Sequence, residues 1–196
     1  MGRIIVIEHL TLDGVMQAPG TPDEDLRDGF QHGGWGNRNQ DPAMRKVMSA
    51  SMSSAWSLLI GRATYEHFAD YWPKQAPNPI TESLDNVQKY VASTTLTEPL
   101  AWQNSTLLKG DAADAVSPLK EELRENLVVF GSGVLVRSLL SRDLVDELVL
   151  MVHPLVLGTG RRLFADSGSD LSAFRLTGSE TTDTGVIIAT YQPAGN

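Results

Sequence analysis

The chain has 196 residues, with 24 acidic and 16 basic side chains, a formal net charge of −8 and no cysteine. This length is typical of one domain, and we expect residues 1–196 to form a single one. The absence of cysteine excludes disulfides, thiolate metal sites and a cysteine nucleophile, and the acidic balance argues against nucleic acid or an anionic membrane surface as a partner.

The sequence shows neither a membrane-spanning segment nor a signal peptide. Its longest apolar stretch is strand-sized, and the N-terminal residues lack the apolar core and small-residue cleavage site of a secretory signal. We therefore expect a cytoplasmic protein whose partner is a small molecule. An anionic ligand would need a local binding site, because the overall charge of the protein repels it.

Strand and helix patterns alternate along the chain. A β-branched run predicts a strand at 3–10, and an irregular region rich in glycine and proline at 17–42 separates it from a helix at 42–55. Further strands are expected at 56–60, 87–93, 105–108, 126–130 and 147–152. Further helices are expected at 63–71, 114–125 and 134–140. The proline-rich segment 73–86 is expected to be a loop, and 174–180 with 186–192 an antiparallel hairpin.

Strands that are apolar throughout and alternate with helices are typical of an α/β protein with a mainly parallel sheet. We expect helices on both faces of this sheet and the C-terminal hairpin at its end. The apolar segment 147–157 could pair with a second copy of the chain across a two-fold axis, so a homodimer is expected.

Two strands are each followed by glycine and then by the start of a helix. The first gives Gly61 and Arg62, and the second gives Gly131-Ser132-Gly133. Ligands bind beyond the carboxyl ends of strands in α/β sheets, and a helix N-terminus there offers free backbone N–H groups to a phosphate. The guanidinium of Arg62 and the hydroxyl of Thr64 would add to such a site.

The third strand is followed by the hydroxyl side chains of Ser93, Thr94 and Thr95 at the same sheet edge. Each of these signals is weak alone: a Gly-x-Gly turn is common, and Arg62 could pair with Glu66 one helical turn later. The dinucleotide fingerprint Gly-x-Gly-x-x-Gly is also incomplete, since Val136 stands where its third glycine would be. Together, the three strand ends predict a dinucleotide site.

These segments, in this order, resemble the dihydrofolate reductase superfamily, and above all the C-terminal reductase domain of the bifunctional riboflavin-biosynthesis deaminase/reductase. The resemblance is carried by the first strand with Leu12-Asp13-Gly14-Val15, by Gly61-Arg62-Ala63-Thr64-Tyr65-Glu66, Lys89-Tyr90-Val91-Ala92-Ser93-Thr94, Phe130-Gly131-Ser132-Gly133 and His153-Pro154-Leu155-Val156-Leu157-Gly158-Thr159-Gly160. It implies a dihydrofolate reductase-like fold and an NADPH-dependent reductase.

The resemblance also implies roles for individual residues. The cofactor phosphates would be held at Gly61, Arg62, Ala63 and Thr64, and the adenosine 2′-phosphate would lie beside Ser93 and Thr94. The pyrophosphate would be wrapped by Gly131, Ser132, Gly133, Val134 and Leu135. The backbone of His9 and Met16 would face the nicotinamide carboxamide, and Asp13, in a mobile loop closing over the nicotinamide, is the candidate catalytic residue.

The substrate side departs from the family pattern. Dihydrofolate reductases bind the pterin ring through a carboxylate early in the first helix, whereas the candidates here are Asp23, Glu24, Asp25, Asp28 and Asp41, any of which could instead be a solvated loop residue. Trp35 could stack on a planar heterocycle or anchor its loop by packing. Tyr71 and Trp72 could line the same cleft or belong to the core.

The expected function is hydride transfer from NADPH to a small planar heterocycle, either pterin-like or 5-amino-6-(5-phosphoribosylamino)uracil-like. The alternative is a non-catalytic nucleotide-binding protein that retains the fold. No metal is expected, because the four histidines lack ligand spacing. No deaminase zinc motif precedes the reductase-like stretch, so a dedicated role in riboflavin synthesis is not expected.

Overall fold

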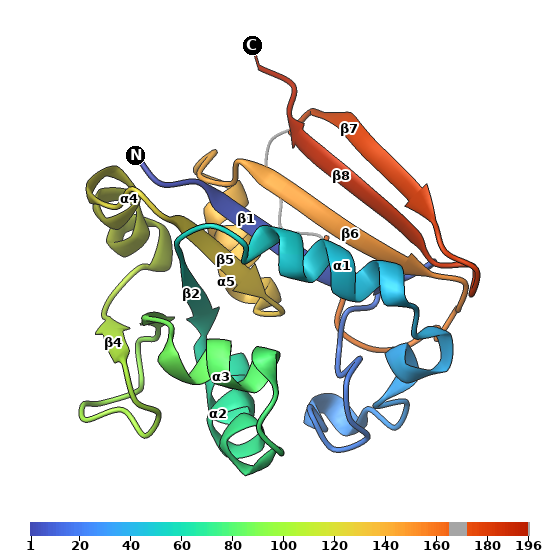
Figure 1. The fold of residues 1–196 in the computed structure, drawn as a ribbon, viewed down its shortest axis with the longest axis horizontal. Helices are drawn as coiled ribbons and strands as arrows, with labels where there is room; N and C mark the ends of the chain where they lie inside the picture. The colour runs from blue at the N-terminus through green and yellow to red at the C-terminus, as the bar shows by residue number, and fades with distance from the viewer. Residues whose placement is uncertain (165–171, 196) are drawn as a thin grey trace.

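The computed structural model describes residues 1–164 and 172–195. Eight strands within these residues form one sheet in the order β4-β3-β2-β5-β1-β6-β8-β7 (Figure 1). The strands are β1 (Ile4–Thr11), β2 (Trp56–Gly61), β3 (Lys89–Ala92), β4 (Ser105–Leu108), β5 (Asn126–Phe130), β6 (Glu147–His153), β7 (Phe174–Thr181) and β8 (Ile187–Pro193). Strands β1 to β6 are mutually parallel, whereas β8 is antiparallel to both β6 and β7. The expected mainly parallel sheet with a C-terminal hairpin is confirmed.

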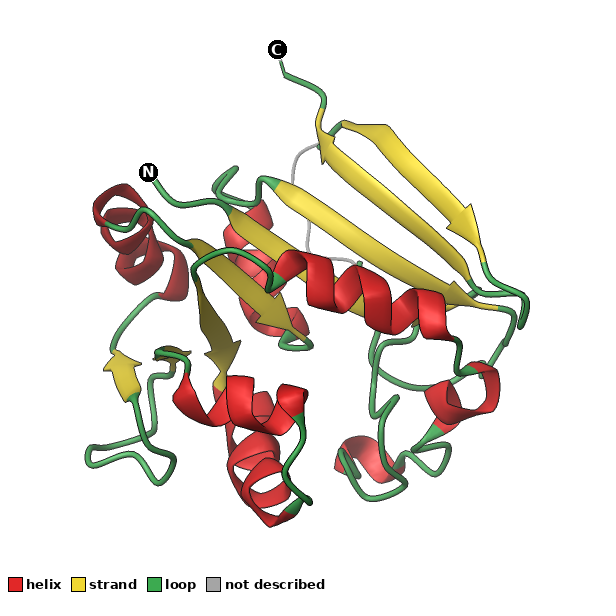
Figure 2. Cartoon of the chain, in the orientation of Figure 1, coloured by secondary structure: helices red, strands yellow, loops and turns green. Residues whose placement is uncertain are grey.

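Helices cover both faces of the sheet (Figure 2). They are α1 (Pro42–Ser51), α2 (Arg62–Tyr71), α3 (Pro79–Asn86), α4 (Ala112–Glu122) and α5 (Gly133–Leu140). Successive strand residues point to opposite faces, so Ile5 and Ile7 pack with α1, α2 and α3, while Ile4 and Val6 pack with α4 and α5. Both faces are buried, which explains why the central strands are apolar throughout.

The strand order places a change of direction beside β1. The chain runs outward from β1 through β2 and β3 to β4, returns to insert β5 between β2 and β1, and then crosses to β6 on the other side of β1. In open α/β sheets, ligands bind in the crevice that such a change creates at the carboxyl ends of the strands. The ends of β1, β2, β3 and β5 therefore mark the edge where a site is expected.

The prediction of a loop over 73–86 was wrong, because this segment contains the helix α3 and the short 3-10 helix η3 (Trp72–Lys74). Asn78 caps α3: its Oδ1 accepts from the N–H groups of Ile80 and Thr81, and the Thr81 hydroxyl accepts from the Asn78 N–H. Pro79 occupies the first helical position, where no N–H is needed. Proline therefore starts a helix here instead of marking a loop.

One other expectation is corrected by the structure. The strand β6 lies between β1 and β8, so both of its edges are already paired and it cannot add a strand from a second copy. The irregular region 17–42 contains two short 3-10 helices, η1 (Arg27–Gly29) and η2 (Trp35–Asn39). Within the described ranges, no helix has the length and apolar character needed to cross a membrane.

Replacing Asn78 with alanine should lower the free energy of unfolding by about 1 kcal/mol, because two N–H groups at the start of α3 lose their acceptor. Urea unfolding of the variant and the wild type measures the difference. The substitution Glu82→Ala, at an exposed position of the same helix, is the control. Equal stability of N78A and wild type would show that the cap does not hold this helix.

Candidate functional site

A cleft of about 1640 Å³ opens at the carboxyl edge of the sheet. Its walls come from β1, α1, α2, α3, the N-terminus of α5 and the loop that follows β1. The pairing of β1 with β5 stops at Ile7 opposite Phe130, whereas the pairing of β1 with β6 continues to Thr11 opposite His153. Beyond Ile7, the side of β1 that faces β5 is therefore free of a neighbouring strand and borders the cleft.

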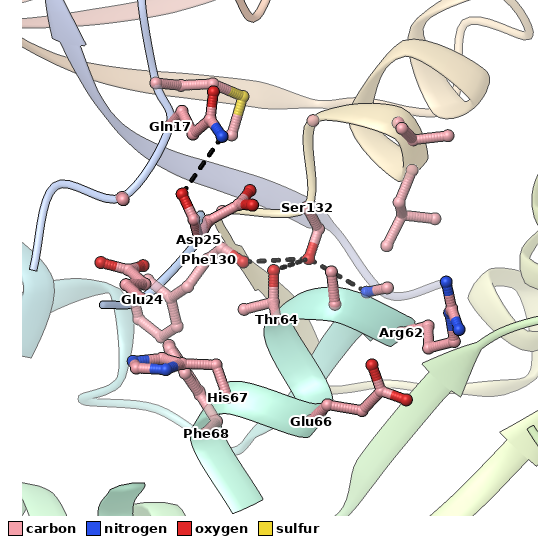
Figure 3. A pocket seen from close by; sticks show the side chains of 18 of the residues that line it. Gln17, Glu24, Asp25, Arg62, Thr64, Glu66, His67, Phe68, Phe130 and Ser132 are labelled. Carbon is pink, nitrogen blue, oxygen red and sulfur yellow. Dashed lines mark hydrogen bonds between the residues drawn. The ribbon is translucent and has the colours of Figure 1, made fainter. Parts of the chain in front are cut away.

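The hydroxyl of Ser132 joins the two glycine turns. The N–H of Gly61 donates to Ser132 Oγ at 3.0 Å, and this hydroxyl lies 3.0 Å from Thr64 Oγ1 and 3.2 Å from the carbonyl oxygen of Phe130 (Figure 3). The turn after β2 and the turn after β5 are thereby held at one point. The N-termini of α2 and α5 meet there, as the sequence predicts.

The backbone of residues 131–133 has a conformation that lets a ligand approach it closely. Gly131 and Ser132 both have left-handed conformations, with φ of +58° and +64°, and the second is unusual for a residue with a side chain. A Cβ added to Gly133 would lie 2.4 Å from Met16 Sδ, so the chain after β1 packs directly against the start of α5. Neither Gly61 nor Ser132, the N-cap residues of α2 and α5, supplies a side-chain cap. The first N–H groups of both helices are thus suited to an anion.

Arg62 is exposed at the start of α2 and lines the cleft. Among the described residues it forms no ion pair, so the pairing with Glu66 that the spacing allows is not made. Ser93 and Thr94 also line the cleft, at the end of β3. Ser93 Oγ accepts from the N–H groups two and three residues further on, at 3.1 and 3.0 Å, which turns the chain so that Thr94 is exposed.

The residues expected beside a nicotinamide ring have other partners. The N–H of Met16 donates to the carbonyl oxygen of Arg161 at 2.9 Å, and His9 Nδ1 lies 2.9 Å from His153 Nε2. Burial lowers the pKa of both histidines to about 4. For His9, repulsion from a protonated His153 lowers the pKa further. The two rings therefore form a neutral pair at pH 7.

The structure does not support a catalytic role for Asp13, which is absent from the lining of the cleft. Its carboxylate accepts from Thr11 Oγ1 at 2.6 Å and from the N–H groups of Leu157 and Gly158, and Arg162 lies 3.5 Å away. These hydrogen bonds, the one from Thr11 above all, lower the pKa of Asp13 to about 2 although burial opposes them. Asp13 ties two loops together and holds no proton to donate at pH 7.

Trp35 is not available for stacking on a ligand, because it lies in a small core and does not line the cleft. It is 2% exposed, its Nε1 donates to the carbonyl oxygen of Gln17 at 2.7 Å, and its ring packs edge-on against His153. The geometry favours the alternative of a packing anchor. Tyr71 and Trp72 do line the cleft, and the buried Nε1 of Trp72 has no hydrogen-bond partner in the part of the chain that is described.

The acidic residues of the loop divide into two groups. Asp41 caps α1, and Asp28 pairs with Arg161, so neither belongs to the cleft. Asp23, Glu24 and Asp25 line it. Glu24 Oε2 accepts from the N–H groups of Gly20 and Thr21 at 2.6 and 3.2 Å. Asp25 forms an ion pair with Arg27 which, although burial opposes it, lowers the pKa of Asp25.

Sequence reasoning missed Glu8 and Gln17. Glu8 is an acid that directly follows the apolar first half of β1. It is 3% exposed and lines the cleft, and its Oε1 has no hydrogen-bond partner among the described residues. Burial, and secondarily the charge of Glu24, raise the pKa of Glu8 well above 4.5. Gln17 organises the loop by donating to the carbonyl oxygens of Asp25 and Arg27. A glutamate inside an apolar strand is the signal that could have identified Glu8.

The family model of the RibD C-terminal domain matches residues 3–188. The chain belongs to this family. Two proteins of Bacillus subtilis (strain 168) are similar in sequence: YyaP is 27% identical over 140 residues, covering 69% of this chain and 72% of YyaP. YwjB is 28% identical over 129 residues, covering 63% of this chain and 66% of YwjB.

Solved structures confirm the dihydrofolate reductase-like fold. A protein of Shewanella sp. PV-4 described as a riboflavin biosynthesis protein has a TM-score of 0.75 and 25% identity, covering 98% of this chain and 99% of that one. A pyrimidine reductase-like protein of Corynebacterium diphtheriae has a TM-score of 0.68 and 14% identity, covering 100% and 93%. Dihydrofolate reductase of Enterococcus faecalis, complexed with NADP(H), has a TM-score of 0.62 and 13% identity, covering 99% and 98%. The chain therefore has a reductase-type fold.

Replacing Asp13 with asparagine should lower the free energy of unfolding at pH 7 by about 1–2 kcal/mol, because charge-assisted hydrogen bonds are lost. The lowered pKa of Asp13 stabilises the fold above its ordinary pKa of 3.8, and this contribution disappears as the pH falls toward 2. Urea unfolding at pH 7 and pH 3, with Asp183→Asn at an exposed turn as control, measures the effect. A constant difference between D13N and wild type at both pH values would contradict the assignment.

Replacing Glu8 with glutamine should stabilise the protein at pH 8. Between 4.5 and the raised pKa of Glu8, the folded state keeps a proton that the unfolded chain releases, so wild-type stability falls as the pH rises, by up to about 1.4 kcal/mol per pH unit. Melting temperatures of E8Q and wild type should differ at pH 8 and converge below about pH 4.5. The exposed Glu82→Gln is the matched control. A wild type as stable as E8Q at pH 8 would show that Glu8 is ionised in the fold.

Proposed function

We propose that the protein is an NADPH-dependent reductase of a small planar heterocycle. The observation that carries this proposal is the meeting of two helix N-termini without side-chain caps, joined by Ser132 and accompanied by Arg62, which has no ion pair in the described part of the chain. This arrangement presents several N–H donors and one fixed positive charge to a single point. A dinucleotide with a pyrophosphate and a further phosphate group binds through such N–H donors and positive charges. Because the protein has a net charge of −8, it can attract this anion only through a local site of this kind.

The chain's own residues suit the parts of this cofactor. The amides of Gly133, Val134 and Leu135 would bind the pyrophosphate, and the left-handed turn before them brings the backbone close. Arg62 and Thr64 would hold phosphate oxygens, and the hydroxyls of Ser93 and Thr94 would lie near the adenosine 2′-phosphate. NADPH, when bound, supplies a hydride.

The other end of the cleft suits a flat, polar ring. It is lined by apolar side chains at α1 and just after it, in α2 and η3, and at the end of β5, namely Met48, Met52, Phe68, Trp72 and Phe130. Two buried polar atoms in this lining, Thr21 Oγ1 and Trp72 Nε1, have no hydrogen-bond partner in the described ranges. A pterin-like or aminopyrimidine-like ring has donors and acceptors along its edge that would pair with such atoms. The 25% identity to a protein described as belonging to riboflavin biosynthesis is consistent with this substrate class.

Replacing Arg62 with alanine should weaken NADPH binding about ten- to a hundredfold, because a hydrogen bond to a charged group contributes about 1.5–3 kcal/mol. Fluorescence titration measures the affinity. Arg124→Ala, an exposed arginine outside the cleft, is the control and should bind like the wild type. Absence of NADPH binding to the wild type up to about millimolar concentration would refute the proposal. Binding without oxidation of NADPH by any pterin, aminopyrimidine or quinone would favour a non-catalytic nucleotide-binding protein instead.

A further inference from the structure

Glu8 occupies a special position on β1. Its register partner on β6 is Leu150, but the last register pair with β5 joins Ile7 to Phe130. Glu8 is therefore the first residue of β1 without a neighbour on β5, and the glycine turn begins directly after Phe130. This position is at the floor of the cleft, next to the turn that the proposed cofactor would occupy.

The carboxyl group of Glu8 is unlike the other acids of the cleft. Glu24 accepts from two backbone N–H groups and Asp25 is paired with Arg27, whereas Oε1 of Glu8 is buried without a partner in the described part of the chain. The carboxylates of Glu24 and Asp25 are therefore already engaged in contacts within the protein. A buried carboxyl oxygen without a partner at a ligand cleft marks a place where a group of the ligand would bond.

The charges around Glu8 favour its neutral form. The same cleft is lined by charged and titratable groups of the loop, α2 and α5, among them Glu24, Asp25, Arg27, His67 and Arg137. Arg27 is held by Asp25, and Arg137 donates to the carbonyl oxygens of Arg162 and Leu163. Burial raises the pKa of Glu8, and the charge of Glu24 adds to this effect. Burial therefore favours the protonated carboxylic acid, the form that has a proton to donate.

We propose that Glu8 is the general acid of this cleft, and that its carboxyl group hydrogen-bonds to the heterocycle and donates the proton that must accompany the hydride. The proposal rests on the reductase function proposed above. The acid therefore lies on β1, whereas the sequence pattern indicated a carboxylate in the acidic loop.

The proposed step balances in atoms and electrons. The electron-poor carbon of a C=N or C=O group receives the hydride that NADPH supplies. The π electron pair of that double bond moves onto the nitrogen or oxygen and forms a new N–H or O–H bond with the proton of Glu8. Glu8 is left as a carboxylate, which water reprotonates, so one NADPH and one proton are consumed for each molecule reduced.

Steady-state kinetics of the full chain test the proposal. The probes are 6-methyl-7,8-dihydropterin, which offers a C=N group, and isatin, a planar heterocycle whose ketone offers a C=O group. In E8Q, kcat should fall about a hundredfold or more with NADPH affinity unchanged, because glutamine keeps the shape of the side chain but has no transferable proton. The wild-type rate should fall as the pH rises through the pKa of Glu8, and E8Q should lack this dependence. Glu82→Gln should match the wild type.

Infrared spectroscopy of the protein without added ligand gives a second readout. The wild type at pH 7 should show a carbonyl stretch of a protonated carboxylic acid that disappears in E8Q and persists in E82Q. Retention of this band in E8Q would overturn the proposal, as would an unchanged kcat and pH profile in E8Q. If the wild type binds NADPH but reduces neither probe, the acid role is refuted and cofactor binding stands. If it does not bind NADPH, the reductase function and the acid role fall together.

Discussion

The hydrogen bond from the Gly61 amide to the Ser132 hydroxyl holds together the two turns on which the site depends. It joins residues 71 positions apart, at the ends of the neighbouring strands β2 and β5. Because Ser132 is left-handed and begins α5 without capping it, its hydroxyl is free to bridge toward Thr64 and Gly61. The N-termini of α2 and α5 are thus directed to one point, and their dipoles give this part of the cleft a locally positive character within an acidic protein.

The cleft is also asymmetric. Arg27 is paired with Asp25 at short distance, whereas Arg62, at the end near α2, forms no ion pair within residues 1–164 and 172–195. Glu24 and Asp25 lie at the opposite end (Figure 3). Glu8, whose burial favours the neutral acid, lines the same cleft. An anionic cofactor at one end and a neutral, hydrogen-bonding ring at the other are the ligands that this distribution of charge accommodates.

Local patterns in the sequence predict much of the fold, because strands buried on both faces are apolar throughout and the glycine turns follow them directly. The order of the strands, which decides that β5 lies beside β1, is a long-range property that no local pattern contains. The helix α3 was missed because Pro79 starts it instead of interrupting it. Asp13 and Trp35 bind groups more than 15 residues away in the sequence, such as the N–H of Gly158 and the carbonyl oxygen of Gln17. The role of Glu8 depends on its burial without a hydrogen-bond partner, and that of Arg62 on its lack of an ion pair, both among the described residues. Resemblance alone could not supply these contacts.

We propose that the ends of β2 and β5 form a phosphate-binding site for a dinucleotide, and a crystal structure of the protein with NADP⁺ would test this proposal. In that structure we expect the pyrophosphate at the amides of Gly133, Val134 and Leu135, with Arg62 on a phosphate oxygen and the nicotinamide ring next to Glu8. A cofactor bound elsewhere on the molecule, or crystals grown at saturating NADP⁺ that contain none, would contradict it.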